Sequence, residues 1–250
     1  MDQNPNLREF FEGGFYLRYW NKDRADAGAE QEAEQVLKLL DAQSGTILDW
    51  RGGWGRHSIH FAEQGFRIVL LDFVKEYLDW AEAAFAERGL GLKTVHADSR
   101  ETPEDIQADF GVCLKSSVGF LEASEELKAF RSLYGALKPG ARMCADGMNL
   151  FFLADKLNPV NETKDADGTI RRQHNSFDFR TNVLKSVFEI ERPDGRKEQQ
   201  EFNQILYTPA DLVRLISDAG FAVEGIYGDY DGRPVSFESP RTVVVARRPR

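Results

Sequence analysis

The segment ILDWRGGWGRHS, residues 47–58, runs from an apolar stretch through a glycine-rich turn into a helical pattern. Glycine lets the backbone turn tightly and approach a ligand, and the N-terminus of the following helix offers unpaired N–H groups. Arg51 stands where such a turn would be expected to carry a glycine. The segment therefore predicts a strand, a cofactor loop with one unusual residue, and a helix.

Downstream, strand-like and helix-like segments alternate. The apolar segments that indicate strands are FRIVLLDF (66–73), LKTVHAD (92–98), DFGVCLKS (109–116) and ARMCADGMN (141–149). Helical spacing is present in residues 74–89, in residues 124–140 with Ser124 as the start, and in residues 208–220 with Thr208 as the N-cap. This alternation with short connections predicts an α/β fold with a doubly wound parallel sheet.

The last third of the chain departs from this alternation. Residues 169–207 are β-rich, with PDGR (193–196) as a hairpin turn. The two final strand-like segments, 221–230 and 241–248, are joined by a loop too short for a crossover helix, so they should be antiparallel neighbours. We expect one domain over residues 1–250, with an N-terminal helical cap over 1–40 and a small antiparallel β insertion over 169–207.

Composition restricts the class of partner. The formal net charge of −9 argues against a nucleic-acid partner, because phosphate binding depends on clustered lysines and arginines. The first residues lack the apolar stretch of a signal peptide, and no apolar run reaches membrane-spanning length. Cys113 and Cys144 lie in apolar segments without a CxxC pattern, as expected for free thiols in a reducing compartment. These features predict a cytoplasmic protein that binds neither nucleic acid nor membrane, and nothing in the sequence indicates its oligomeric state.

Three acidic residues end three successive predicted strands. Asp49 precedes the glycine turn, Asp72 ends the second strand, and Asp98 ends the third. Open parallel sheets bind ligands at these strand ends, and an acid after the second strand typically accepts hydrogen bonds from ribose hydroxyls. A nicotinamide site would place a glycine where Ser58 stands, so a nucleoside cofactor without phosphates fits better.

In order along the chain, these segments resemble the motifs of class I S-adenosylmethionine-dependent methyltransferases. DWRGGWG (49–55) resembles the first motif, VLLDF (69–73) the ribose-binding strand end, HADSRE (96–101) the adenine-edge acid, and SPRTVVVARRP (239–249) the last strand. The resemblance implies a Rossmann-like seven-stranded sheet with an antiparallel last strand, a β insertion that forms a lid on the acceptor side, and S-adenosylmethionine as cofactor. It also implies methyl transfer to a nitrogen or oxygen of a small-molecule acceptor.

The resemblance assigns a role to each matching position. It places Asp49, Gly53 and Gly55 at the methionine-side turn, Asp72 at the ribose, and Phe73 against the adenine. It places Asp98 and the backbone of Ser99 at the adenine edge, and Lys115 with Ser116 beneath the sulfonium. The N-terminal Tyr16, Arg18 and Tyr19 are expected to fold over the amino-acid end of the cofactor.

The acceptor side has weaker motifs. The residues expected to form the acceptor pocket are Tyr16, Phe120, Asn149, His174, Tyr207 and Arg233. His174 is the candidate general base, and Arg171 and Arg172 are candidates for recognising a polar or anionic molecule. No metal-ligand cluster stands out, so we expect no metal.

Arg51 and Trp54 leave three interpretations open. Both side chains could point away from a shifted glycine turn, Arg51 could pair with the methionine carboxylate, or both could fill the methionine pocket. The alternatives to methyl transfer follow from the same two residues. One is a cofactor-dependent cyclisation or a lyase that releases methylthioadenosine, and the other is a non-enzymatic module with little cofactor binding.

Overall fold

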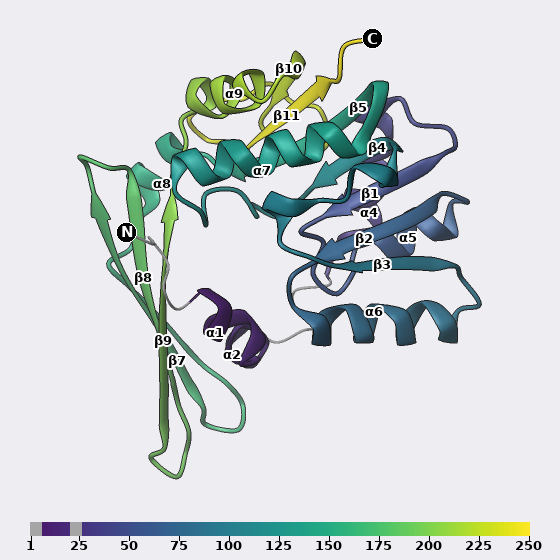
Figure 1. The fold of residues 1–250 in the computed structure, drawn as a ribbon. Coiled ribbons are helices and arrows are strands. Elements are labelled where there is room, and N and C mark those ends of the chain that lie inside the picture. Colours follow the sequence, from purple (N-terminus) through teal and green to yellow (C-terminus); the bar gives the residue numbers. More distant parts are fainter. Residues whose placement is uncertain (1–6, 21–26) are drawn as a thin grey trace.

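The computed structural model describes residues 7–20 and 27–250, and these form two sheets (Figure 1). The larger sheet has seven strands in the order β10-β11-β5-β4-β1-β2-β3. Its strands are β1 (Thr46–Trp50), β2 (Arg67–Asp72), β3 (Leu92–His96), β4 (Ala108–Cys113), β5 (Leu137–Met148), β10 (Ala222–Tyr227) and β11 (Arg241–Arg247). Strands β1 to β5 pair in parallel, whereas β11 is antiparallel to both β5 and β10. The predicted Rossmann-like sheet with an antiparallel last strand is therefore confirmed.

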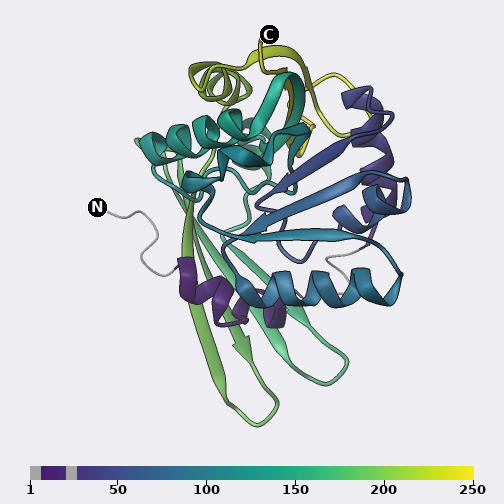
Figure 2. The ribbon, with the colours of Figure 1, turned by 45° about the vertical axis from the view of Figure 1, so that its right-hand side comes forward.

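Helices cover both faces of this sheet (Figures 1 and 2). On one face lie α4 (Ala29–Leu40), α5 (Ser58–Glu63) and α6 (Lys75–Glu87), and on the other lie α7 (Ala123–Ala136) and α9 (Pro209–Asp218). Successive side chains of a strand point to opposite faces, so Ile47 packs with the first group and Leu48 with the second. This burial on both faces explains why the parallel strands are almost continuously apolar.

The connection between β3 and β4 lacks a long helix. It contains two 3₁₀ turns, η1 (Ser99–Glu101) and η2 (Glu104–Ile106). The two cysteines are buried and unpaired on the neighbouring strands β4 and β5, as predicted. Among the described residues, no helix has the length and apolar character that a membrane-crossing helix requires.

The second sheet is antiparallel and stands beside the first (Figure 1). It follows the short helix α8 (Leu150–Lys156) and contains β6 (Val160–Lys164), β7 (Ile170–Asp178), β8 (Val183–Glu191) and β9 (Lys197–Ile205). The hairpin turn at 193–196 is confirmed, since Arg192 N donates to Arg196 O. The sheet begins at Val160, earlier than the predicted residue 169, because the fully exposed VNETK strand has no apolar alternation that would reveal it.

The described helices of the N-terminal segment pack on two different sheets. Helices α1 (Leu7–Glu12) and α2 (Phe15–Trp20) pack against the four-stranded sheet, where Phe10, Phe15 and Tyr19 form a cluster with Phe188 and Ile190. Helix α4 packs instead on the seven-stranded sheet. Residues 1–6 and 21–26 of the expected cap lie outside the described residues. The first two helices thus join the inserted sheet to the main domain (Figures 1 and 2).

Thr208 provides a test of the predicted start of α9. Its Oγ1 accepts a hydrogen bond of 3.1 Å from the N–H of Asp211. Thr208→Ala should therefore lower the free energy of unfolding by about 1 kcal/mol, measured by urea denaturation.

Ser124→Ala is the matched control. Helix α7 begins at Ala123 with Glu122 at the N-cap and no side-chain cap bond, so Ser124 does not have the predicted capping role. This variant should change the free energy of unfolding by less than about 0.5 kcal/mol. Equal losses in the two variants would contradict the assignment of the cap.

Candidate functional site

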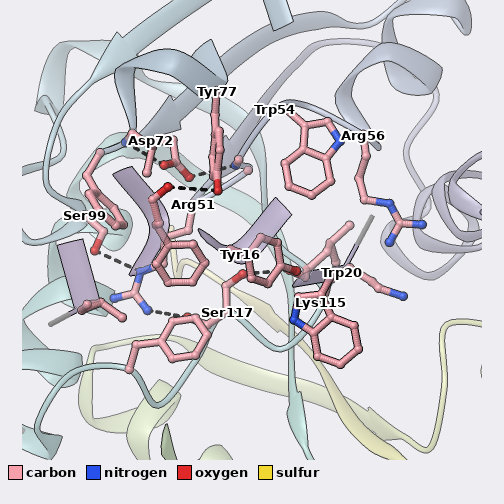
Figure 3. A pocket seen from close by; sticks show the side chains of 18 of the residues that line it. Tyr16, Trp20, Arg51, Trp54, Arg56, Asp72, Tyr77, Ser99, Lys115 and Ser117 are labelled. Carbon is pink, nitrogen blue, oxygen red and sulfur yellow. Dashed lines mark hydrogen bonds between the residues drawn. The ribbon is translucent and has the colours of Figure 1, made fainter. Parts of the chain in front are cut away.

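A cavity of about 1220 Å³ opens where the parallel strands end. One wall is formed by residues that follow β1, β2, β3 and β4, and the opposite wall by α1, α2, β6 and β7. Figure 3 shows side chains that line it, including Tyr16, Arg51, Trp54 and Asp72. The cavity thus lies at the sheet edge predicted for the cofactor, between the main domain and the inserted sheet.

The glycine turn after β1 is closely packed. A Cβ atom at Gly52 would lie 2.4 Å from Leu70 Cδ1 and 2.5 Å from Asp49 Cγ, so only glycine fits there. Gly53 and Gly55 adopt positive φ angles of 59° and 72°. Gly55 nevertheless does not reach the cavity wall of the described residues, and it lies over the core beside Leu70. The turn therefore presents Gly52 and Gly53 to the cavity.

Asp72 ties this turn to the end of β2. Its Oδ2 accepts the N–H of Gly53 at 2.8 Å, and its Oδ1 accepts the N–H of Val74 at 2.9 Å. Burial raises the pKa of this carboxyl, although the backbone hydrogen bonds oppose that shift. The N–H of Phe73 also acts as a backbone donor to Asp72, so the carboxylate keeps only part of its acceptor capacity. A hydroxyl group of a ligand would match that remaining capacity.

Arg51 lies across the ends of three strands (Figure 3). Its backbone has a φ of 62°, which explains why glycine is expected there. Its Nε donates to Ser99 Oγ at 3.0 Å, and its Nη1 donates to Ser117 O at 2.8 Å and pairs with Glu126 Oε1 at 2.5 Å. The Glu126 side chain is fully buried, so the guanidinium has one carboxylate partner within the protein, whereas its Nη2 is buried without a hydrogen-bond partner among the described residues.

Trp54 lies on the opposite side of the turn. Its ring centre is 6.2 Å from that of Tyr16 and 5.6 Å from that of Tyr77, and the three rings form an aromatic wall. Arg51 and Trp54 both line the cavity, yet they leave it open. The geometry thus speaks against the interpretation in which these two side chains fill the methionine pocket.

Asp98 and Ser99 lie at the end of β3 as expected, but both side chains have partners. Asp98 accepts hydrogen bonds from the backbone N–H, Nε and Nη2 of Arg100, at distances of 2.9, 3.0 and 2.7 Å. The hydrogen bonds and charge of Arg100 lower the pKa of Asp98, even though partial burial opposes the shift. Asp98 is therefore ionised, with limited acceptor capacity left for an adenine amino group.

Arg56 is a site residue that the sequence analysis missed. Its side chain is only 8% exposed, its Nη2 donates to Ala27 O at 3.1 Å, and its Nε–H is buried without a hydrogen-bond partner among the described residues. It lines the cavity beside Trp54 and Lys115 (Figure 3). No sequence motif indicates that Arg56 belongs to the site, because its position there depends on contacts with residues distant in the sequence, such as Ala27 and Glu32.

Glu32 of α4 lies close to several basic side chains at the end of the cavity where Arg56 is found. It lies 3.2 Å from Arg56 Nη2, 3.0 Å from Lys115 Nζ and 2.9 Å from His57 Nε2. Burial raises the pKa of Glu32, but the hydrogen bond from His57 and the charges of Lys115 and Arg56 outweigh it and lower the pKa to about 2. Burial lowers the pKa of His57 to about 4, so a neutral imidazole donates to an ionised Glu32.

Lys115 and Ser116 adopt left-handed backbone conformations, with φ of 64° and 59°. Ser116 N–H and Oγ both donate to buried Asp146, which also accepts a hydrogen bond from Tyr230 Oη at 2.5 Å. Tyr230 Oη in turn accepts the N–H of Lys115 at 3.0 Å. These bonds hold the end of β4 in a conformation that directs Lys115 to the cavity.

Several of the residues predicted for the two pockets line the cavity. They are Tyr16, Tyr19, Asp49, Arg51, Gly53, Asp72, Phe73, Asp98, Ser99, Lys115 and Phe120. Arg18 is not part of this wall, and its guanidinium pairs with Glu198 at 2.9 Å. Its neighbour Tyr19 lines the cavity and also packs against Phe188 of β8.

Four residues predicted for the acceptor pocket lie away from the cavity wall. Asn149 is buried, caps α8 and donates to the carbonyl oxygens of Ser236 and Ser239. His174 is exposed, on the face of β7 opposite to Arg171, and Arg233 is exposed and pairs with Asp231. Tyr207 forms an isolated bridge with Asn149. These residues were predicted from their position in the sequence near the sheet edge. That position does not show which way a side chain points: Asn149 is used as a helix cap, and His174 lies on the face of β7 opposite to Arg171.

The cavity fits the S-adenosylmethionine that the sequence implies. The ribose hydroxyl groups match the remaining acceptor capacity of Asp72, and the carboxylate of the methionine end matches the unpartnered Nε–H of Arg56. Ionised Glu32 lies where it could balance excess positive charge beside that carboxylate. Within residues 7–20 and 27–250, no group of three or more metal-ligating side chains could hold a metal ion.

Comparison with known proteins shows that the chain is similar to methyltransferases. Residues 47–140 match the model of a methyltransferase domain. The chain is 29% identical over 247 residues to a glycine/sarcosine N-methyltransferase of Parasynechococcus marenigrum, covering 95% of this chain and 82% of that protein. It is 25% identical over 176 residues to a ubiquinone/menaquinone biosynthesis C-methyltransferase of Proteus mirabilis, covering 65% and 68% of the two chains.

Solved structures share the fold at lower identity. An S-adenosylmethionine-dependent methyltransferase from Clostridium acetobutylicum superposes with a TM-score of 0.82 and 17% identity, over 95% of this chain and 99% of that one. An amino pentose methyltransferase from Micromonospora echinaspora, solved with bound S-adenosylmethionine, gives a TM-score of 0.67 and 19% identity over 95% and 96%. Both cover the inserted sheet as well as the main domain, since each spans nearly the whole chain.

Asp49 should make the stability of the free protein depend on pH. Burial, with the charge of Asp72 adding to it, raises the pKa of Asp49 to about 7, although the hydrogen bond from Ser58 opposes the shift. The folded protein therefore holds a proton that the unfolded chain has lost, and stability falls as pH rises from about 4 to 7. Asp49→Asn should raise the free energy of unfolding at pH 8 by about 1–3 kcal/mol and change it little at pH 4.

Asp109→Asn is the control with the opposite sign. Although burial opposes it, the hydrogen bond from Lys138 contributes to lowering the pKa of Asp109, so this variant should not gain stability at pH 8. Urea denaturation of the wild type and both variants at pH 4, 6 and 8 measures the difference. A loss of stability in Asp49→Asn that is the same at every pH would contradict the assignment.

Proposed function

The chain is a class I S-adenosylmethionine-dependent methyltransferase, and on that premise we propose that it transfers a methyl group to a nitrogen or oxygen of a small molecule. The size of the cavity carries this proposal. Its volume of about 1220 Å³ exceeds the roughly 300–1,000 Å³ of most ligand pockets. A cofactor and a small acceptor can therefore lie in it together.

We propose that the cofactor extends along the strand ends. Asp72 holds the ribose hydroxyl groups, and the ring of Phe73 and the backbone near Ser99 bound the adenine. Gly53 allows close approach at the turn, and Arg56 binds the methionine carboxylate. In this arrangement Arg51 supports the cavity floor through Glu126 and Ser117, without pairing with the cofactor carboxylate.

The bound cofactor supplies a methyl group on a positively charged sulfur, and the protein has to align the acceptor and exclude water. Displacement at such a carbon depends mainly on positioning the nucleophile in line at about 3 Å. The rings of Tyr16, Trp54 and Phe120 line the cavity together with Lys115 and give this part of it an apolar surface. A neutral amine can attack without a base, whereas an ammonium group first has to release its proton.

Nitrogen is favoured over oxygen as the accepting atom. An alcohol needs a general base, and the histidine in the cavity wall, His57, has its Nε2 bonded to Glu32. Burial raises the pKa of Tyr16 and of Tyr77, so their phenols remain protonated near neutral pH. The name of the Parasynechococcus relative, an N-methyltransferase, supports the same choice.

Calorimetry followed by product analysis tests this function. One equivalent of S-adenosylmethionine should bind, and a panel of small amines and alcohols should then be assayed for adenosylhomocysteine and methylated product by mass spectrometry. Methylthioadenosine without a methylated product would instead support cyclisation or a lyase. Failure to bind the cofactor would support a non-enzymatic module.

Arg56→Gln should weaken the binding of S-adenosylmethionine by about tenfold or more, since one charge-assisted hydrogen bond is lost. Methylthioadenosine lacks the amino-acid end, so its dissociation constant should stay within about twofold. Arg88→Gln is the control, because Arg88 is exposed and pairs with Glu63 outside the cavity. Equal weakening of both ligands by Arg56→Gln would contradict the proposed contact.

A further inference from the structure

Four polar side chains of the inserted sheet face the cavity together. Asn161 and Thr163 belong to β6, and Arg171 and Gln173 belong to β7. The register pairs Asn161 with Gln173 and Thr163 with Arg171. Residues two apart on a strand share a face, so these four side chains form one polar surface, which we call the β6–β7 surface.

Arg171 is the charged member of the β6–β7 surface, and one of its donors lacks a partner. Its Nη1 pairs with Asp165, whereas its Nε–H is buried and has no hydrogen-bond partner among the described residues. A buried donor without an acceptor is unfavourable by about 1–3 kcal/mol. Asp165 fixes the orientation of the guanidinium, and an oxygen atom of a ligand would satisfy the remaining donor.

The neighbouring Arg172, on the same strand, differs from Arg171 because its guanidinium pairs with several carboxylates of the protein. Its side chain points to the opposite face, where it pairs with Glu162, Glu189 and Glu191 at 2.7, 2.7 and 2.6 Å. Three carboxylates leave that guanidinium no need for a ligand. The two adjacent arginines were equal candidates in the sequence, and the alternation of β7 separates them.

Aromatic side chains line the cavity beside the polar β6–β7 surface. Tyr16, Tyr19 and Trp20 line the cavity from α2, and Trp54 and Phe120 line it from the main domain. Polar groups that converge beside such aromatic side chains fix the orientation of a ligand. Planar guanidinium groups suit carboxylates, because they donate in the plane of the two oxygens.

We propose that the acceptor carries a carboxylate, and that Arg171 binds it on the β6–β7 surface, with Gln173, Asn161 and Thr163 able to donate further hydrogen bonds. The proposal rests on the proposed methyl transfer to a small molecule and adds the chemical class of the acceptor. It makes Arg171 a specificity-determining residue. The accepting nitrogen then lies at the other end of the acceptor, toward Lys115 and the glycine turn.

Matched acceptor pairs test the proposal on the full chain loaded with cofactor. Glycine, β-alanine and 4-aminobutyrate are each compared with the corresponding carboxamide, with adenosylhomocysteine release as the readout. The wild type should methylate at least one acid with a kcat/KM at least tenfold above that of its amide. Arg171→Gln should raise the KM for that acid about tenfold or more and change kcat by less than about threefold.

Two variants separate recognition from folding. Arg171→Lys keeps the charge and should recover part of the affinity for the acid. Arg172→Gln disturbs the same strand on its opposite face and should leave the preference for acid over amide unchanged. Equal use of acids and amides by the wild type, or an unchanged preference in Arg171→Gln, would overturn the proposal.

Binding measurements keep this proposal distinct from the proposed function. The same acids are titrated by calorimetry into protein saturated with adenosylhomocysteine. Binding that Arg171→Gln abolishes, without any methylated product, would support the carboxylate site and contradict methyl transfer to these amines. Absence of binding by every acid would overturn the carboxylate site, even if another molecule proved to be methylated.

Discussion

The hydrogen bonds accepted by Asp72 are the constraint on which the site depends. One buried carboxylate receives the N–H of Gly53 at 2.8 Å and that of Val74 at 2.9 Å, and so fixes the turns that follow β1 and β2 relative to each other. A carboxylate is costly to bury unless donors satisfy it, and these donors come from the backbone. The course of both turns is therefore set by the group that also presents acceptor positions to the cavity. The positive φ of Gly53 makes this geometry possible.

Local patterns allowed much of the fold to be predicted from the sequence. The apolar runs, the Thr208 cap and the hairpin at 193–196 follow rules that act over a few residues, and the structure agrees with each. Strand β6 was missed because its exposed residues carry no apolar period. The sequence did not mark Arg56, and it did not separate Arg171 from Arg172, for a different reason: the roles proposed for Arg56 and Arg171 rest on long-range contacts. Each depends on which donors distant segments leave unpaired, and no local spacing encodes that. Asn149 shows the reverse, since its position suggested a ligand contact while the fold uses it as a cap.

Arg51 changes how the glycine turn is understood. The residue accepts an unfavourable left-handed backbone, as do Lys115 and Ser116 at the end of β4. In both places side-chain bonds compensate, through Glu126 for Arg51 and through Asp146 for Ser116. A guanidinium beside a cationic cofactor would be repulsive without an opposing charge, and buried Glu126 supplies it. Arg51 thus stabilises the glycine-rich turn through its contacts with Glu126 and Ser117.

The packing of α1 and α2 on the inserted sheet joins residues that are synthesised early to residues that are synthesised late. Arg18 and Glu198 pair across 180 positions, and Phe10 meets Phe188 and Phe202 at ring distances of 5.4 and 4.7 Å. During translation these aromatic side chains leave the ribosome long before their partners exist. They cannot pack against these partners until β8 and β9 have been synthesised, and such distant pairings carry a large loop-closure entropy. The cavity wall formed by α1 and α2 therefore reaches its final packing only after β9 has been synthesised, and β10 and β11 complete the seven-stranded sheet later still.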